Sequence, residues 1–397
     1  MSSAAFRLIL LVSCAHALVH AYELSLPSVE QDIAEEFLGD DEQAGKKFTG
    51  VLQNYWRLLW GTGALLAGLL VDRLGSRSML AVYLVGCGLA CLLAGMASSQ
   101  GQLLTTMILM GAFAAIYHPA GLALISHETT DEARPKALGI HGIFGSLGIG
   151  LAPMIAWAMS TAGFQWRQFY WTLAIPGMLL GAYFFASLRR VPEPHSKNSA
   201  KSNKPDDNAD WTSYGILTVF SFLQGFVYSA LLSFLPRYLS GSGIEIFQTS
   251  EQSTGKLFAS IVLWVGCVGQ YIAGRFARHR ILELQLAIIT FGNVPFLCWM
   301  ALASTWDRVV AAALLALVHF MQQPVYNSLI AKYSPAKHRS LCYGVSFAMA
   351  FGLGSFGSRF AGSMQSDLYV YGLLAGLAAM GGVIGLVLWM FNRENVE

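Results

Sequence analysis

Charged residues are scarce in this sequence. Only 12% of its 397 residues are Asp, Glu, Lys or Arg, whereas 55% are hydrophobic and the mean hydropathy is +0.51. Soluble domains carry roughly 25% charged residues. A chain with half that fraction cannot present an ordinary soluble surface, so its composition predicts an all-α polytopic membrane protein.

The signatures of catalysis and of ATP hydrolysis are also missing. There is no Walker-type loop, no Ser–His–Asp arrangement in a polar segment and no extramembrane stretch large enough for an active site. We therefore expect a protein that is not an enzyme, needs no cofactor and draws energy from an ion gradient or from its substrate's own gradient. The six cysteines lie in apolar runs without a CxxC pair, which indicates reduced packing residues and not a disulfide frame.

Long apolar runs fill most of the chain. A membrane-spanning helix needs about 20 mostly apolar residues, and the sequence divides into twelve such spans. They lie at 6–28, 48–71, 78–98, 101–125, 135–160, 168–188, 212–238, 255–275, 281–302, 307–331, 340–364 and 368–391. The polar segment 190–210 separates six spans from six. It predicts an N-terminal half (1–189), a flexible linker (190–210) and a C-terminal half (211–397).

The first run has a second interpretation. Arg7, the apolar residues 8–12 and the pair Ser13-Cys14 are similar to a signal peptide or a lipoprotein cleavage site. The apolar run continues to Leu26, which favours an uncleaved first span.

The distribution of Lys and Arg predicts the orientation. With twelve spans both termini lie on one side, and that side carries seventeen of the 25 Lys and Arg residues, against six on the other. Cytoplasmic loops are enriched in these residues. We therefore expect both termini and the linker in the cytoplasm and the chain in the inner membrane of the cell.

The two halves repeat each other weakly. Pro119 and Pro324 are 205 residues apart, and Pro27 in the first span is echoed by Pro236 in the seventh. Two parallel six-span halves around a site at the membrane midplane are typical of secondary transporters. We expect these four prolines to kink their helices and to let the halves rock.

The loop after the second span carries a motif. It reads Gly68-Leu-Leu-Val-Asp72-Arg73-Leu-Gly75-Ser-Arg77. This resembles the signature loop of the major facilitator superfamily, and with six spans on each side of the linker the resemblance covers the whole chain. It implies a transporter in which this gating loop latches the two halves together. Gly68 and Gly75 are expected to permit close helix approach and a tight turn.

Two narrower resemblances point to export. The glycine-rich stretch 139–153 of the fifth span is similar to the antiporter motif of exporters in this superfamily. The run Tyr117-His118-Pro119 looks like the fosmidomycin-resistance branch of proton-coupled efflux proteins. That branch has an acidic residue about four positions after the first-span histidine, whereas here His20 follows His16 and the acid comes later. The arginine that many drug–proton antiporters carry in the fourth span is absent from 103–116.

The superfamily resemblance also implies which spans line the central cavity, namely the first, fourth, seventh and tenth. The polar residues of these spans, with Asn54 of the second, are the predicted substrate site. They are Asn54, Tyr117, His118, Gln224, Tyr228, His319, Gln322, Gln323 and Asn327. His141 and Arg359 are further polar residues within spans, for which we favour packing and snorkelling to the interface.

A proton-coupling group is predicted from ionisable residues inside the spans. His16, His20 and Glu23 follow one another at i, i+4 and i+7, so they share one stripe of a helix. Unpaired charge within a membrane is costly, and Arg57 lies about 14 Å from the outer end of its own span. We therefore expect Glu23 to approach Arg57, either as a structural pair or as a switch in which protonated Glu23 frees Arg57 for an anionic substrate.

The two histidines of the stripe have three interpretations. They could relay protons, because histidine titrates near physiological pH. With Glu23 they offer two nitrogens and one oxygen to a divalent metal ion. They could also simply hydrogen-bond neighbouring helices.

The leading hypothesis is a proton-coupled exporter, an antiporter that moves a small organic compound by alternating access; Arg57 suggests an anionic one. The alternatives are a proton-coupled importer of a small solute, a transporter of a divalent metal ion or metal chelate, and a membrane sensor that transports nothing. The expected partners are the small-molecule substrate, protons and the lipid bilayer. We expect a monomer that binds no nucleic acid.

Overall fold

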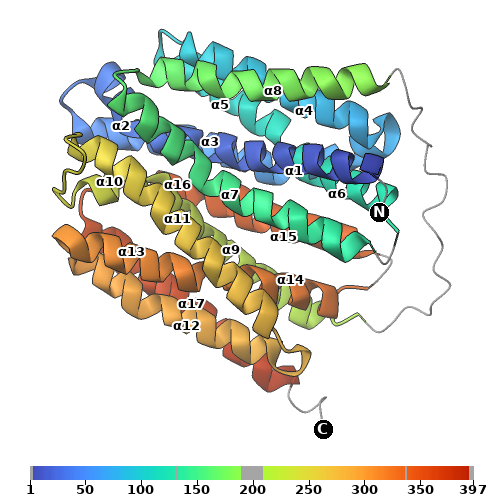
Figure 1. Cartoon of the computed structure of the whole chain (residues 1–397). Coiled ribbons are helices and arrows are strands. Elements are labelled where there is room, and N and C mark those ends of the chain that lie inside the picture. The colour runs from blue at the N-terminus through green and yellow to red at the C-terminus, as the bar shows by residue number, and fades with distance from the viewer. Residues whose placement is uncertain (1–2, 131–132, 189–208, 336–337, 393–397) are drawn as a thin grey trace. The chain divides into compact units, whose positions relative to one another are not determined.

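The computed structural model describes residues 3–130, 133–188, 209–335 and 338–392 (Figure 1). Within these ranges the chain is helical and contains no strand. It divides into two compact units, Met1–Ser199 and Ala200–Glu397, which are described separately below. Most of the predicted linker lies outside the described residues.

The N-terminal unit is built from eight helices in the part of the chain that the structure describes. They are α1 (Ser3–Glu23), α2 (Ser25–Leu38), α3 (Glu42–Leu74), α4 (Ser76–Gly95), α5 (Gln100–Ala114), α6 (Tyr117–Glu128), α7 (Arg134–Thr161) and α8 (Trp166–Leu188). The main packing pairs are α1 with α7, α4 with α8, and α3 with α5.

The C-terminal unit follows the same plan. Its helices are α9 (Trp211–Ser233), α10 (Leu235–Ser240), α11 (Glu251–Phe276), α12 (Leu282–Leu302), α13 (Thr305–Phe320), α14 (Gln322–Tyr333), α15 (Arg339–Phe347), α16 (Phe356–Ser363) and α17 (Asp367–Asn392), with the short turns η1 (His279–Ile281), η3 (Ala348–Gly352) and η4 (Leu353–Ser355). Here α12 packs with α17, α11 with α13, and α9 with α16 and α17.

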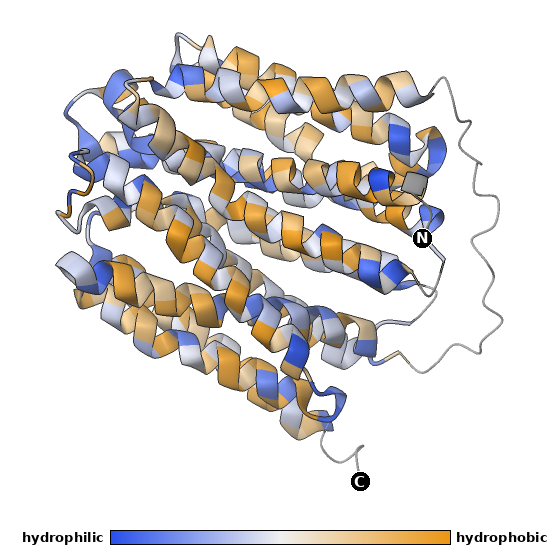
Figure 2. Ribbon diagram, in the orientation of Figure 1, coloured by the Kyte–Doolittle hydropathy of each residue, from blue (hydrophilic) through white to orange (hydrophobic). Residues whose placement is uncertain are grey.

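Hydropathy assigns most of these helices to the membrane. Eleven helical stretches of the described residues are long and apolar enough to cross a bilayer, and orange, hydrophobic residues recur along the helical ribbons (Figure 2). The predicted second span corresponds to α3, which is not among the eleven. With 33 residues it is about 50 Å long and exceeds the hydrocarbon thickness, but Gln53, Asn54 and Arg57 lower its hydropathy. We take α3 as the twelfth span, and its buried Gln53, Asn54 and Arg57 account for the lower hydropathy.

Four spans are interrupted where prolines were predicted to kink them. α1 gives way to α2 at Leu24, three residues before Pro27, and α9 gives way to α10 at Phe234, two residues before Pro236. α5 and α13 end just before Pro119 and Pro324 in the same way. Proline has no N–H and leaves the carbonyl four residues earlier unbonded, so each break follows from the sequence.

Glycines bring the first and fifth spans of the N-terminal unit into backbone contact, as the small-residue spacing of the fifth span predicts. A Cβ added to Gly148 in α7 would lie 2.3 Å from the carbonyl oxygen of Ala17 in α1. A Cβ added to Gly145 would lie 2.3 Å from the ring of His16. The C-terminal unit repeats the arrangement, because a Cβ added to Gly357 in α16 would lie 2.1 Å from the carbonyl oxygen of Phe226 in α9.

Candidate functional site

A buried ion pair joins the first two spans of the N-terminal unit. Nη1 of Arg57, from the middle of α3, lies 3.1 Å from Oε1 of Glu23, the last residue of α1. The side chains are 1% and 0% exposed. The predicted approach of Glu23 to Arg57 is therefore confirmed. The two charges compensate each other in a span where neither could stand alone at low cost.

The second oxygen of the same carboxylate contacts a histidine. His20 Nδ1 lies 2.9 Å from Oε2 of Glu23, one helical turn away in α1. Glu23 thus lies between an imidazole, which contacts one carboxylate oxygen, and a guanidinium, which forms an ion pair with the other. Since α1 ends here, the negative end of the helix adds to the carboxylate charge, and both partners offset it.

A second group of ionisable side chains lies next to this pair. His118, which follows the break between α5 and α6, meets His16 and His20 of α1, with ring centroids 5.5 and 5.9 Å away. The rings of His16 and His20 are 5.0 Å apart. The nitrogens of the three histidines that could bind a metal ion all lie within 4.8 Å of one another. We call these three residues the histidine cluster.

His141 of α7 and Tyr117 of α6 stack on His16 of the histidine cluster. The ring of His141 stacks on His16 at 4.0 Å, and the His141 carbonyl oxygen lies 2.8 Å from His16 Nδ1. The Tyr117 hydroxyl donates to the carbonyl of Val12 at 2.9 Å and lies 3.4 Å from His141 Nδ1. Both residues are buried and hydrogen-bonded, so their contacts hold α6 and α7 against α1.

The polar residues predicted for the C-terminal half lie in two different settings. Tyr228 of α9 stacks on His319 of α13 with ring centroids 6.2 Å apart. Gln224, one turn before Tyr228, points elsewhere: a Cβ added to Gly381 of α17 would lie 2.3 Å from its amide nitrogen. Gln224 is 7% exposed and packs against α17.

The remaining predicted cavity residues are spread over α14 and α3. Gln322 is buried, whereas Gln323 is exposed and accepts a hydrogen bond from the amide of Gln270 in α11. Asn327 is exposed, and its backbone carbonyl accepts from the Tyr343 hydroxyl at 2.8 Å. Asn54 is buried in α3, 2% exposed and one turn from Arg57.

The predicted gating loop forms the tight turn between α3 and α4. Gly75 has φ 86°, which a residue with a Cβ rarely adopts, so the turn requires this glycine. Arg77 bonds Glu128 at the end of α6, with Nη2 2.6 Å from Oε1. Asp72 and Arg73 are exposed. A Cβ added to Gly68 meets no other described atom within 4 Å, so packing inside the unit does not explain that glycine.

The C-terminal unit has a matching ion pair of reversed polarity, which sequence reasoning missed. Glu283 at the start of α12 accepts from Lys332 at 2.5 Å and from the Tyr333 hydroxyl at 2.6 Å, both at the end of α14. These positions lie 206 and 204 residues after Arg77 and Glu128. A search at the repeat offset of about 205 residues predicts this pair only if the acidic and the basic residue may exchange positions between the halves.

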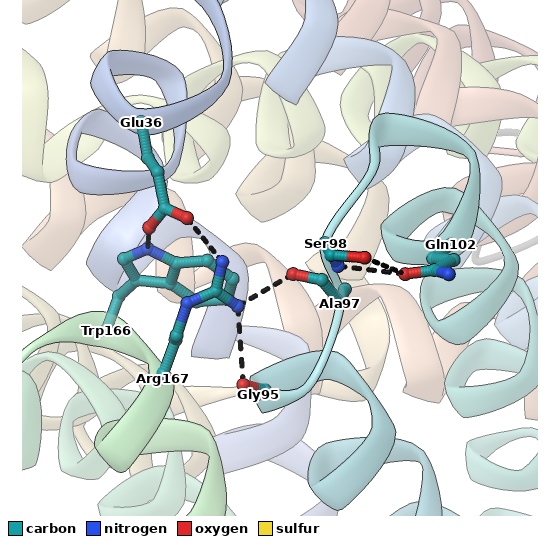
Figure 3. A network of polar contacts seen from close by, with 7 residues as sticks. All are labelled: Glu36, Gly95, Ala97, Ser98, Gln102, Trp166 and Arg167. Carbon is teal, nitrogen blue, oxygen red and sulfur yellow. Dashed lines mark hydrogen bonds and ion pairs between the residues drawn. The ribbon is translucent and has the colours of Figure 1, made fainter.

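A polar network holds the opposite end of the N-terminal unit (Figure 3). Glu36 of α2 accepts from Trp166 Nε1 at 2.7 Å and from Arg167, both at the start of α8. Arg167 also donates to the carbonyls of Ala97, at 2.7 Å, and Gly95, at 3.3 Å. One guanidinium therefore ties together α2, α8 and the turn after α4.

Comparison with known proteins assigns the family. A family model described as Major Facilitator Superfamily matches residues 21–358, well over half of the chain. The chain belongs to the Major Facilitator Superfamily. The resemblance of the gating loop to that superfamily and the all-α fold of twelve spans are both confirmed, and membership places the chain among membrane transporters of small molecules.

Individual members of the superfamily are more distant. Puromycin resistance protein pur8 from Streptomyces alboniger is 34% identical over 145 residues, 36% of this chain and 27% of that protein. The probable L-galactonate transporter from Escherichia coli strain K12 is 27% identical over 283 residues, 66% of this chain and 60% of that protein. The matches thus span less than two thirds of either relative. The fold matches the inward-open xylose transporter XylE from E. coli with TM-score 0.73, over 95% of each chain at 15% identity.

Proposed function

We propose that this superfamily member is a secondary active transporter that couples the movement of a small organic anion to protons. Glu23 takes the proton, and Arg57 holds the anion. The observation that carries the proposal is the buried contact of 3.1 Å between these two side chains. The similarity to a probable L-galactonate transporter supports an anionic solute.

The argument rests on charge balance. A buried ion pair is tolerable only while both charges are present, and loss of one leaves the other uncompensated at a cost of several kcal/mol. When Glu23 binds a proton, Arg57 loses the negative charge that faces it at 3.1 Å. A carboxylate or sulfonate of the solute is then the group that restores neutrality, with the two-pronged geometry that guanidinium favours.

The direction of coupling follows from the same balance. Because protonation of Glu23 frees Arg57, proton binding and anion binding favour each other, and by linkage each raises the affinity for the other. A proton and an anion that bind to the same state of the transporter cross the membrane in the same direction. The geometry therefore supports symport of proton and anion, the importer alternative, over the antiport that we expected from the sequence.

Antiport is the second candidate, and a different observation favours it. The similarity to a puromycin resistance protein, together with the glycine-rich fifth span, suggests export. In that case a cationic solute would compete with the proton for Glu23. Proton and solute would then exclude each other, and the affinity for solute would fall as the medium becomes more acidic.

Two charged or titratable side chains contact Glu23. Arg57 contacts it from α3 and His20 from its own helix. Beyond His20 lies His118 of α6, and His141 of α7 stacks on His16, one turn before His20. His20 contacts the carboxylate directly and further histidines lie beyond it, so a pH dependence has to be assigned by substituting Glu23 itself.

Solute binding to the purified full chain at several pH values tests the proposal. L-galactonate serves as the anionic probe and puromycin as the amine. Anion symport predicts that L-galactonate affinity rises as pH falls, and that puromycin does not bind. Antiport predicts that the affinity for puromycin decreases as the pH is lowered. A pH-independent affinity for L-galactonate would contradict symport, and a pH-independent affinity for puromycin would contradict antiport.

A further inference from the structure

We propose that the histidine cluster, His16, His20 and His118, is a binding site for a divalent metal ion of the zinc class. The three imidazoles are the ligands and Glu23 only supports His20, so metal binding can be tested apart from proton coupling. It also differs from the site that the sequence suggested, which had Glu23 as the third ligand.

The spacing of the rings suits a single metal ion. Zinc binds imidazole nitrogen at about 2.0–2.1 Å, and the centre of each ring lies roughly 1 Å farther out, so two tetrahedral ligands have ring centres about 5 Å apart. The three separations in the structure are 5.0, 5.5 and 5.9 Å. Small side-chain rotations would bring all three nitrogens onto one ion.

The Nδ1 nitrogens of His16 and His20 each contact an oxygen atom, as the second ring nitrogen of a metal-binding histidine usually does. His16 Nδ1 lies 2.8 Å from the carbonyl oxygen of His141, and His20 Nδ1 lies 2.9 Å from a carboxylate oxygen of Glu23. Such bonds place the hydrogen on Nδ1 and leave the lone pair of Nε2 for the ion. In both residues a hydrogen bond therefore orients the ring before any metal binds.

Glu23 is the wrong third ligand for a structural reason. Its Oε1 bonds Arg57 and its Oε2 bonds His20, so the carboxylate supports the cluster through His20. His118 takes the third position instead, because the break between α5 and α6 brings it over α1. The position could not be read from sequence spacing, since His118 lies about one hundred residues from the other two.

Three neutral imidazoles define the class of ion. Nitrogen ligands suit zinc, copper, nickel and cobalt over magnesium or calcium, which prefer oxygen. Three protein ligands also leave a fourth tetrahedral position for water or for a donor atom of a bound solute, the arrangement of open zinc sites. A free metal ion and a metal chelate would bind through the same three nitrogens. Binding of the free ion without a chelating solute distinguishes the first from the second.

Zinc binding to the full chain tests the proposal. The protein is purified without a polyhistidine tag, stripped with a chelator and titrated with Zn²⁺ alone by calorimetry. We expect one ion per chain, and a loss of affinity of more than about 10-fold in His16→Ala and in His118→Ala. The control is His319→Ala, which removes a buried histidine of the C-terminal unit and should bind one ion like the unmodified protein.

A spectroscopic measurement covers the case in which the alanine variants fail to fold. Co²⁺ bound to the unmodified protein should give the intense visible absorption of a tetrahedral nitrogen site. Glu23→Gln should keep the ion, because the amide oxygen can still accept from His20, so a failure of proton coupling and a failure of metal binding are told apart. The proposal is overturned if the stripped protein takes up no stoichiometric Zn²⁺ or Co²⁺, or if folded His118→Ala binds as tightly as the unmodified chain.

Discussion

Glu23 at the end of α1 forms an ion pair with Arg57 in the middle of α3 through one carboxylate oxygen and contacts His20 through the other. The break at Leu24 and the absence of an N–H on Pro27 end the helix here, so Glu23 lies at a helix terminus and not inside a regular turn. A group at such a terminus can change partners without unwinding a continuous helix. This local arrangement is the basis of the predictions below.

The energy of the pair can be measured in a double-mutant cycle. Glu23→Gln and Arg57→Gln each remove one charge of a buried ion pair, so each should lower the free energy of unfolding by about 3–5 kcal/mol. The double variant Glu23→Gln/Arg57→Gln removes both charges and should lose less than the sum of the two single effects. Denaturant unfolding in detergent provides the measurement. Additive losses would show that the two residues do not interact.

Backbone contact between α1 and α7 predicts intolerance at Gly148. Gly148→Ala would place a Cβ 2.3 Å from the Ala17 carbonyl, an overlap that typically costs about 1–3 kcal/mol. The matched control is Gly142→Ala in the same helix, where a Cβ meets no described atom within 4 Å and higher helix propensity should stabilise by up to about 1 kcal/mol. Thermal unfolding of the two variants should shift in opposite directions. Equal shifts would contradict the close approach.

The reversed ion pairs predict a specific rescue. Arg77→Glu places two carboxylates together at Glu128 and should lower thermal stability. Adding Glu128→Arg rebuilds the pair with the polarity that the C-terminal unit already uses at Glu283 and Lys332, and should restore it. If the double reversal is no more stable than Arg77→Glu alone, the two units do not use equivalent contacts at these positions.

Arg167 is predicted to resist replacement by lysine. Its guanidinium bonds Glu36 and two backbone carbonyls at once, and a single ammonium cannot reproduce that fork (Figure 3). Arg167→Lys should therefore lower the melting temperature, whereas Arg359→Lys, at an exposed position of α16, should leave it unchanged. A similar effect of both substitutions would assign the loss to charge hydration and not to the network.

The sequence predicted most of the fold and part of the site. Hydropathy located the spans and proline located the breaks, because both effects act within one segment. The Glu23–Arg57 pair was predictable because two opposite charges in neighbouring spans have few other ways to avoid isolation. By contrast, the approach of His118 to His16 depends on the direction in which α6 leaves the break.

The direction of side chains was the second property that the sequence did not predict. Gln224 and Tyr228 are one turn apart in α9 and were expected in one cavity, yet Gln224 fills the space that Gly381 leaves in α17. The Glu283–Lys332 pair was missed because the repeat preserves the contact while exchanging the two charges. Neither feature follows from local spacing, since each depends on a residue far away in the chain.

Glu23 as the proton-binding group is tested most directly by transport in proteoliposomes with an imposed pH gradient. Glu23→Gln is compared with the unmodified chain and with Glu30→Gln, a control that replaces another buried glutamate, 1% exposed in α2. We predict that Glu23→Gln loses uptake driven by the pH gradient but keeps exchange of labelled for unlabelled solute, while Glu30→Gln keeps both. Gradient-driven uptake that persists in Glu23→Gln would contradict the assignment.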